Sequence, residues 1–232
     1  MLEFTRQDKM IFLIQSNHHL LPVIHRFGLR LGFRNKTVEE LCKEYNINTA
    51  FFLTIVNTFH NKNFFPTQKL LSFSPLLIID YLKKTHLYYI TWSLPQIEQL
   101  MHQLQISASD QFKEMKMIEE FYLRYKNKLL LHIQEEEEKV FPYVERLMKN
   151  PGEKMNRDFD PNFEEEHEHV DFELDDLKNL ILKFIPPVYD ELVCNKLLDE
   201  IYRFEKDIHD HARIEDAILI PQVEQLQNKV NG

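Results

Sequence analysis

Two stretches of the sequence share one pattern, and this pattern decides the fold. Residues 132–142 read HIQEEEEKVFP, and residues 211–221 read HARIEDAILIP. In both, a histidine comes four residues before a glutamate and ten residues before a proline. On an α-helix, a spacing of four places two side chains on one face, about 40° apart and one turn along the axis. One cation could therefore contact both side chains of each pair: His132 with Glu136, and His211 with Glu215.

Each copy of the pattern also has a lone histidine upstream, on the preceding predicted helix. The chain therefore reads as two similar helical hairpins, with His86 before the first copy and His167 before the second. Packed together, the hairpins would bring these side chains into the interior of a bundle, where such folds build cofactor sites. Imidazole and carboxylate together suit iron, and bridging carboxylates can hold two ions close to each other. The predicted metal ligands are His86, His132, Glu136, His167, His211 and Glu215.

Helix phase separates these histidines from their neighbours. A ligand must share the core-facing stripe of its helix with apolar residues three or four positions away. The predicted ligands meet this condition, whereas His102 and His209 have polar neighbours at helical spacing and are predicted to face solvent. His169 points about 200° away from His167 and is the poorer candidate.

A reading without metal is the alternative for each residue taken singly. One histidine on an apolar stripe is more often a hydrogen-bonded core residue than a ligand, but six ligand-type residues with shared phase and spacing favour a metal site. Without metal, each of the six buried polar groups would need its own hydrogen-bond partner. In the acidic run 135–138, only Glu136 has the register to turn inward, and most of the run is predicted to be a solvated face.

The composition predicts an all-α protein. The 232 residues include only 4 Gly, and 44% are hydrophobic, which favours helices. Long helical patterns occur at about 75–103, 108–149, 162–184 and 189–228, with short loops between them, so an antiparallel four-helix bundle is expected.

A second, smaller unit is predicted at the N-terminus. Proline at 66 and the stretch 73–75 interrupt the apolar pattern, which suggests a small helical domain at 1–70 and the bundle at 71–232. Thr37, with an acidic residue three positions on, is predicted to cap a short helix, and Asn48 or Thr49 to cap another. In the first long helix, Pro95 is expected to open a new turn or cause a kink.

Charge and cysteine content exclude several classes of function. A net charge of −9 and a pI near 5.7 give no attraction to nucleic acid or to anionic membrane surfaces. The sequence has neither a long apolar run nor the features of an export signal, so a cytoplasmic location is expected. Cys42 and Cys194 lie far apart and outside any CxxC motif, so they are predicted to be buried reduced thiols.

These motifs carry a family resemblance. Residues from about 75 onward resemble the hemerythrin-like domain, and the whole chain resembles the repair-of-iron-centres family within that group. In that family, histidines terminally ligate two non-haem Fe ions that two glutamates bridge, so the resemblance implies a carboxylate-bridged di-iron centre with Glu136 and Glu215 as bridges. The motifs are Asp80-Tyr-Leu-Lys-Lys-Thr-His86, His132 and Glu136 before Phe141-Pro142, Glu166-His167, and His211 and Glu215 before Pro221.

The chain departs from this family at three places. Residues 31–34 read LGFR where the family often has a Cys-Cys-Gly-Gly stretch. Leu87 stands where the family often has a second, adjacent histidine, but helix phase favours His86 as the ligand. The family also often has an extra histidine near the position of Ser107, and His102, the nearest replacement, is out of phase. One iron is therefore expected to have fewer protein ligands and to leave a position for water, dioxygen or nitric oxide.

The resemblance implies a cytoplasmic di-iron protein of the nitrosative or oxidative stress response, which supports repair of damaged iron-sulfur or iron centres. Its partners would be a small diatomic ligand (O2 or NO) and iron-centre proteins, and a homodimer is an open alternative for its assembly. A conventional enzyme is not expected, although redox or nitric oxide chemistry at the irons is. The alternative function is a dioxygen or nitric oxide sensor or carrier that signals to a protein partner. A ferritin-like oxidase is disfavoured because those sites use Glu-x-x-His and more carboxylates.

Overall fold

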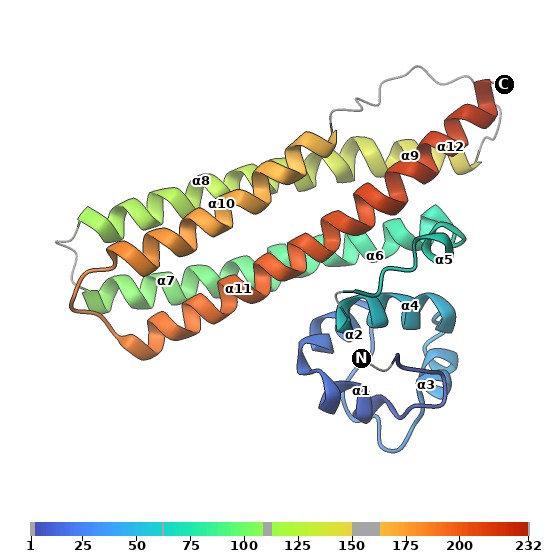
Figure 1. Cartoon of the computed structure of the whole chain (residues 1–232), viewed down its shortest axis with the longest axis horizontal. Coiled ribbons are helices and arrows are strands. Elements are labelled where there is room, and N and C mark those ends of the chain that lie inside the picture. The colour runs from blue at the N-terminus through green and yellow to red at the C-terminus, as the bar shows by residue number, and fades with distance from the viewer. Residues whose placement is uncertain (1–2, 62, 109–112, 150–162, 232) are drawn as a thin grey trace. The chain divides into compact units, whose positions relative to one another are not determined.

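The computed structural model describes residues 3–61, 63–108, 113–149 and 163–231, with the side chains of 108, 163–172 and 228–231 outside the description. Within these ranges the chain forms helices and no strand, apart from an isolated antiparallel bridge between Lys9 and Thr37. The all-α prediction is therefore confirmed (Figure 1). None of the described helices is long and apolar enough to cross a membrane.

The N-terminal part of the chain, before α6, is built of short helices. Its α-helices are α1 (Met10–Ser16), α2 (Leu21–Arg26), α3 (Val38–Glu44), α4 (Thr49–His60) and α5 (Thr67–Leu71), with a 3-10 turn, η1 (His18–Leu20), between the first two. The long helices that follow are α6 (Pro75–Tyr88), α7 (Leu94–Ala108), α8 (Lys113–Glu135), α9 (Phe141–Lys149), α10 (Phe163–Phe184), α11 (Glu191–Ile214) and α12 (Ile220–Asn231). Five-residue π-helical segments join some of these: η2 (Tyr89–Ser93), η3 (Glu136–Val140) and η4 (Glu215–Leu219).

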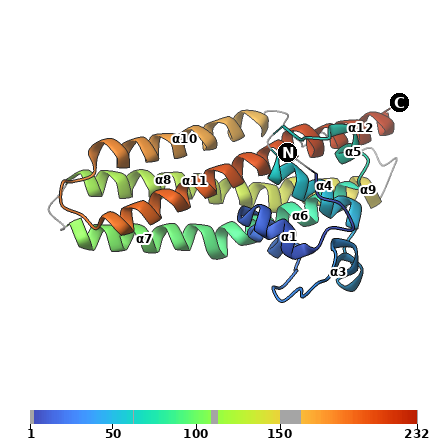
Figure 2. The same ribbon diagram turned by 60° about the horizontal axis from the view of Figure 1, so that its bottom comes forward.

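The long helices form the expected four-helix bundle. Helix α7 packs against α11, α8 packs against α10, and α10 also packs against α11. Neighbouring helices run antiparallel, and the same arrangement is seen in two orientations (Figures 1 and 2). Buried apolar residues recur at spacings of three and four, as an amphipathic helix requires. Examples are Leu174, Leu177 and Ile181 on α10, and Leu197, Ile201, Phe204 and Ile208 on α11.

Backbone contacts divide the chain into two compact units. One comprises Met1–Thr85 with Ala217–Gln222, and the other comprises His86–Asp216 with Val223–Gly232. The division falls inside α6 and inside η4, so continuous helical segments belong to both units. The domain boundary that the sequence suggests near residue 70 stays a prediction, because a division by contacts does not test whether the parts fold independently.

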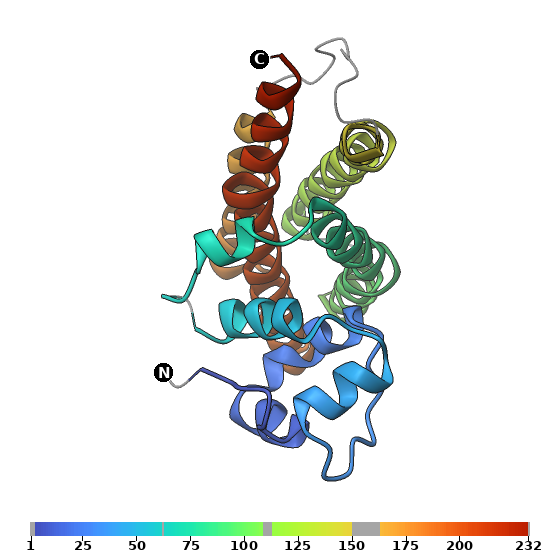
Figure 3. The ribbon, with the colours of Figure 1, turned by 90° about the vertical axis from the view of Figure 1, so that its right-hand side faces the viewer.

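Helix α4 is the most buried helix of the N-terminal part, whose short helices run from blue to turquoise in Figure 3. Every residue of α4 from Phe51 to Phe59 is buried, and Phe27 packs on the Phe52 ring with centroids 5.0 Å apart. Asn48, one of the two caps that the sequence allows, accepts a hydrogen bond from the Phe51 N–H at 3.0 Å. Cys42 and Cys194 are both free and buried, as predicted, and burial raises the pKa of the Cys42 thiol to about 11. Thiol chemistry at neutral pH is therefore disfavoured at Cys42.

The capping box predicted at Thr37 is confirmed. The Thr37 hydroxyl accepts a hydrogen bond from the Glu40 N–H at 3.3 Å, and the Glu40 carboxylate accepts one from the Thr37 N–H at 2.8 Å. Both interactions satisfy N–H groups that the first turn of α3 would otherwise leave unpaired.

We predict that Thr37→Ala lowers the free energy of unfolding by about 1 kcal/mol, because the α3 N-terminus loses its cap. Chemical denaturation followed by circular dichroism measures this change. Thr37→Ser keeps the hydroxyl and is the matched control, with a stability close to that of the parent. Equal stabilities for the alanine variant and the parent would contradict the prediction.

Candidate metal centre

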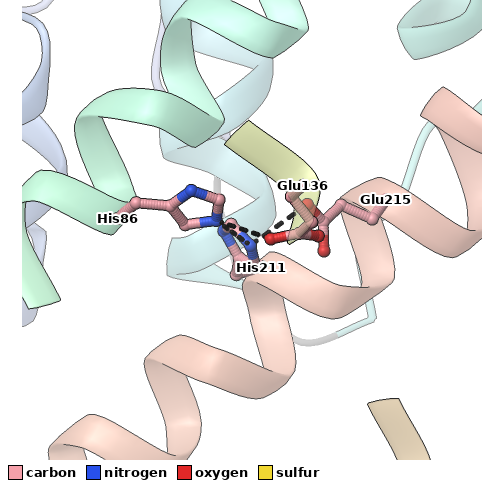
Figure 4. Close-up of side chains that lie close together, drawn as sticks. All are labelled: His86, Glu136, His211 and Glu215. Atoms are coloured by element: carbon pink, nitrogen blue, oxygen red, sulfur yellow. Dashed lines mark hydrogen bonds and ion pairs between the residues drawn. The ribbon is translucent and has the colours of Figure 1, made fainter. Parts of the chain in front are cut away.

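Four side chains converge in the interior of the bundle, where α6 and α11 reach the π-helical segments (Figure 4). His86 lies near the end of α6 and His211 near the end of α11, while Glu136 opens η3 and Glu215 opens η4. Each residue offers a nitrogen or oxygen ligand atom, and these atoms all lie within 4.8 Å of one another. None of the four is more than 7% exposed. The structure thus brings together four of the six predicted ligands in a cluster that could hold a metal ion.

The ligand atoms face one another directly. His86 Nε2 lies 3.0 Å from Glu136 Oε2 and 3.2 Å from His211 Nε2. His211 Nε2 in turn lies 3.2 Å from the Oε1 atom of Glu215. At most one proton can lie between two imidazole nitrogens, so the arrangement concentrates lone pairs at one point. Such a set of donors is what a cation requires.

The charges of the cluster also favour a cation. Two carboxylates buried beside each other cost free energy unless positive charge balances them. Burial by itself lowers the pKa of His86, but hydrogen bonds to Glu136 and Glu137 outweigh this effect and raise the pKa to about 9. The negative charge of Glu215 acts in the same direction. At neutral pH, without metal, His86 therefore carries a proton that a bound metal ion would displace.

His132 lies beside this cluster and is 8% exposed. Its Nε2 atom is 3.5 Å from Glu136 Oε1, whereas the other oxygen of the same carboxylate faces His86. Glu136 therefore presents one oxygen to each of two histidines from different helices. The side chain of His167 lies outside the described residues, although the backbone there belongs to α10, so its role stays a prediction.

The histidines that helix phase assigned to the surface are at the surface. His102 and His209 are both exposed. On α6, His86 is only 2% exposed, whereas the next residue, Leu87, is 60% exposed. This burial agrees with the choice of position 86 over position 87 for the predicted ligand. The side chain of His169, like that of His167, lies outside the description.

Sequence reasoning missed the groups that contact the predicted ligands. Glu137 was grouped with the solvated acidic run, yet its Oε1 atom lies 3.0 Å from His86 Nδ1. A carboxylate on the second nitrogen of a ligating imidazole fixes its ring orientation and tautomer. The Phe141 ring stacks on the His86 ring, with centroids 5.6 Å apart and an angle of 15° between the ring planes. The Tyr89 ring contacts the His211 ring, with centroids 5.8 Å apart. The sequence feature that could have revealed these contacts is the proline six residues after Glu136 and after Glu215. Such a proline changes the helical register of the residues that lie between it and the glutamate.

We predict that Glu136→Ala and Glu215→Ala each weaken metal binding at least about tenfold, because removing a ligand should cost no less than removing its supporting partner. The measurement is metal content by mass spectrometry after reconstitution and desalting. His102→Ala and His209→Ala remove exposed histidines and are the controls, with the metal content of the parent. Equal metal content in all four variants would contradict the assignment.

A second prediction concerns the support of His86. Glu137→Gln should weaken metal binding by about tenfold or more, since the amide cannot replace the carboxylate that orients the ring. Glu138→Gln changes the next residue of the same acidic run, which is exposed, and should leave affinity unchanged. Competition with a coloured chelator gives both affinities. A similar loss in the two variants would show that the run acts only through its overall charge.

Comparison with known proteins agrees with this geometry. The family model described as "Hemerythrin HHE cation binding domain" matches residues 78–223, which is more than half of the chain and includes all six predicted ligands. No curated protein matches the sequence. The buried histidine and glutamate side chains are thus those of a cation-binding domain, and the chain belongs to the hemerythrin HHE cation-binding domain family.

Proposed function

We propose that this chain binds two non-haem iron ions and that Glu136 and Glu215 bridge them. The observation that carries the proposal is the two-sided contact of Glu136, whose oxygens face His86 at 3.0 Å and His132 at 3.5 Å. A carboxylate between two histidines is suited to join two ions, each with its own terminal imidazole. The repeat in the sequence extends this geometry to Glu215, with His211 on one side and His167 as the expected ligand on the other.

The donor set suits iron. Imidazole and carboxylate ligands with an open coordination position are typical of non-haem iron sites, which supply redox chemistry and bind small diatomic molecules. The residues around the cluster bind and orient: Glu137 fixes the His86 ring, and Phe141 covers one face of that ring. The burial of the four clustered ligands keeps bulk water away from the centre.

We further propose that the protein acts in the cytoplasm in the response to nitrosative or oxidative stress and supports the repair of damaged iron centres. The sequence resemblance supports this role, and the buried cluster of histidines and glutamates supplies a site at which such chemistry could take place. The alternative is a sensor or carrier of the same gases. The departures at residues 31–34 and the buried Cys42 argue that any repair chemistry depends on the iron rather than on thiols.

Protein purified without oxygen is expected to contain two irons per chain, because two bridging carboxylates are available. Its visible absorption should change on exposure to air and, in a separate sample, to nitric oxide. Elemental analysis and absorption spectroscopy measure both. Failure to bind iron even after reconstitution would overturn the proposal.

The same samples separate the two roles. A stable oxygenated form that releases dioxygen reversibly would favour the carrier or sensor, whereas rapid oxidation or reduction of nitric oxide would favour stress chemistry. In cells, recovery of iron-sulfur enzymes after nitric oxide should depend on the parent chain. The repair role would be wrong if Glu136→Ala restored recovery as well as the parent does.

A further inference from the structure

The π-helical segments of the described chain all stand at the same distance from a proline. Segment η2 begins at Tyr89, six residues before Pro95. Segment η3 begins at Glu136, six residues before Pro142, and η4 repeats this spacing from Glu215 to Pro221. Two of the three segments therefore open on a glutamate of the metal cluster. Such segments are rare in helices and occur frequently at functional sites.

Proline explains why the helix widens at these points. It has no N–H to donate, and in a regular α-helix its ring would collide with the carbonyl four residues earlier. Adding one residue to the preceding turn relieves the collision. The N–H before each of two prolines accordingly bonds to the carbonyl five residues back: Phe141 to Glu136, and Leu94 to Tyr89.

The extra residue changes which side chains face the cluster. In a regular helix at about 100° per residue, Phe141 would lie about 180° around the axis from His132, on the opposite face. With one residue absorbed by the wide turn, the difference falls to about 80°. Phe141 is in fact fully buried and stacked on His86. The wide turn therefore keeps the helix beyond Glu136 directed at the site.

The first helix provides an internal comparison. Tyr89 stands six residues before Pro95, as Glu136 and Glu215 stand six residues before their prolines. The same wide turn before a proline is therefore present there, but it begins at a tyrosine instead of a carboxylate. The Tyr89 ring packs on Phe204 and His211 instead. Pro95 thus follows the same kind of wide turn beside the cluster, but the residue that opens this turn contributes an aromatic ring instead of a predicted ligand.

We propose that Pro142 and Pro221 are positioning residues of the metal centre, because the wide turns that they impose keep the helix beyond Glu136 and beyond Glu215 directed at the cluster. The proposal rests on the proposed function for the identity of the metal, but its geometric part concerns the chain alone. It assigns a role to two residues that have no side-chain group able to bind a metal.

The test compares Pro142→Ala and Pro221→Ala with Pro95→Ala. Alanine is the best helix former, so all three variants are expected to fold and to allow a regular helix at the substituted turn. Iron per chain, the rate of iron loss to a chelator and the visible spectrum are measured, together with the melting temperature of the metal-free proteins. The two ligand-side variants should lose iron at least about tenfold faster, by analogy with loss of an outer support, and show shifted absorption bands. Pro95→Ala should keep the parent's stoichiometry and spectrum.

Parent-like iron retention and spectra in Pro142→Ala and Pro221→Ala would overturn the inference. An equally fast loss of iron in Pro95→Ala would also overturn it, because a general effect of removing a proline from a helix would then explain the results. If the parent itself bound no iron, the proposed function would fail, and crystal structures of the metal-free proteins would decide the inference separately. A Phe141 ring that leaves His86 in Pro142→Ala supports it, and an unchanged stacking of the two rings overturns it.

Discussion

The burial of two carboxylates side by side constrains this structure more than any other interaction. Glu136 and Glu215 are each at most 1% exposed, and their neighbours in the cluster are imidazoles rather than permanently charged groups. The balancing charge must come either from a proton, as the raised pKa of His86 indicates, or from a metal ion. The helices that carry these four clustered side chains must therefore converge on one point, and the ends of α6, α8 and α11 do so.

Much of the fold and of the cluster followed from the sequence, because a spacing of four on an amphipathic helix fixes both the face and the partner. The burial of His86 and the exposure of His209 agree with that reasoning. That reasoning assumed about 100° per residue throughout a helix and therefore did not predict the π-helical segments. Pro95 was expected to open a turn or cause a kink, and helix α7 begins at Leu94, directly before it, after such a segment. Glu137 was overlooked because it was assigned to the solvated acidic run, yet both Glu136 and Glu137 contact the His86 ring.

Family membership and fold together define what kind of site this is, while the residues around it give the site its individual character. The family description concerns cation binding in general. The particular features of this chain are a carboxylate on the outer nitrogen of His86, an aromatic ring on its face, and a leucine at the neighbouring position. In the N-terminal unit, Cys42 is fully buried and Phe27 packs on Phe52, so this part has the properties of a structural element.

The hydrophobic cluster of the bundle has a consequence for how the protein is made. Buried apolar side chains form one cluster, which includes Tyr89, whose ring contacts His211, together with Ile97, Leu104, Leu129 and Ile208. Most of the interior is thus held by interactions that need no metal, unlike small zinc domains, which are unfolded without their ion. With a core of this extent, we expect the chain to fold before it meets a cation, so that metal loading follows folding.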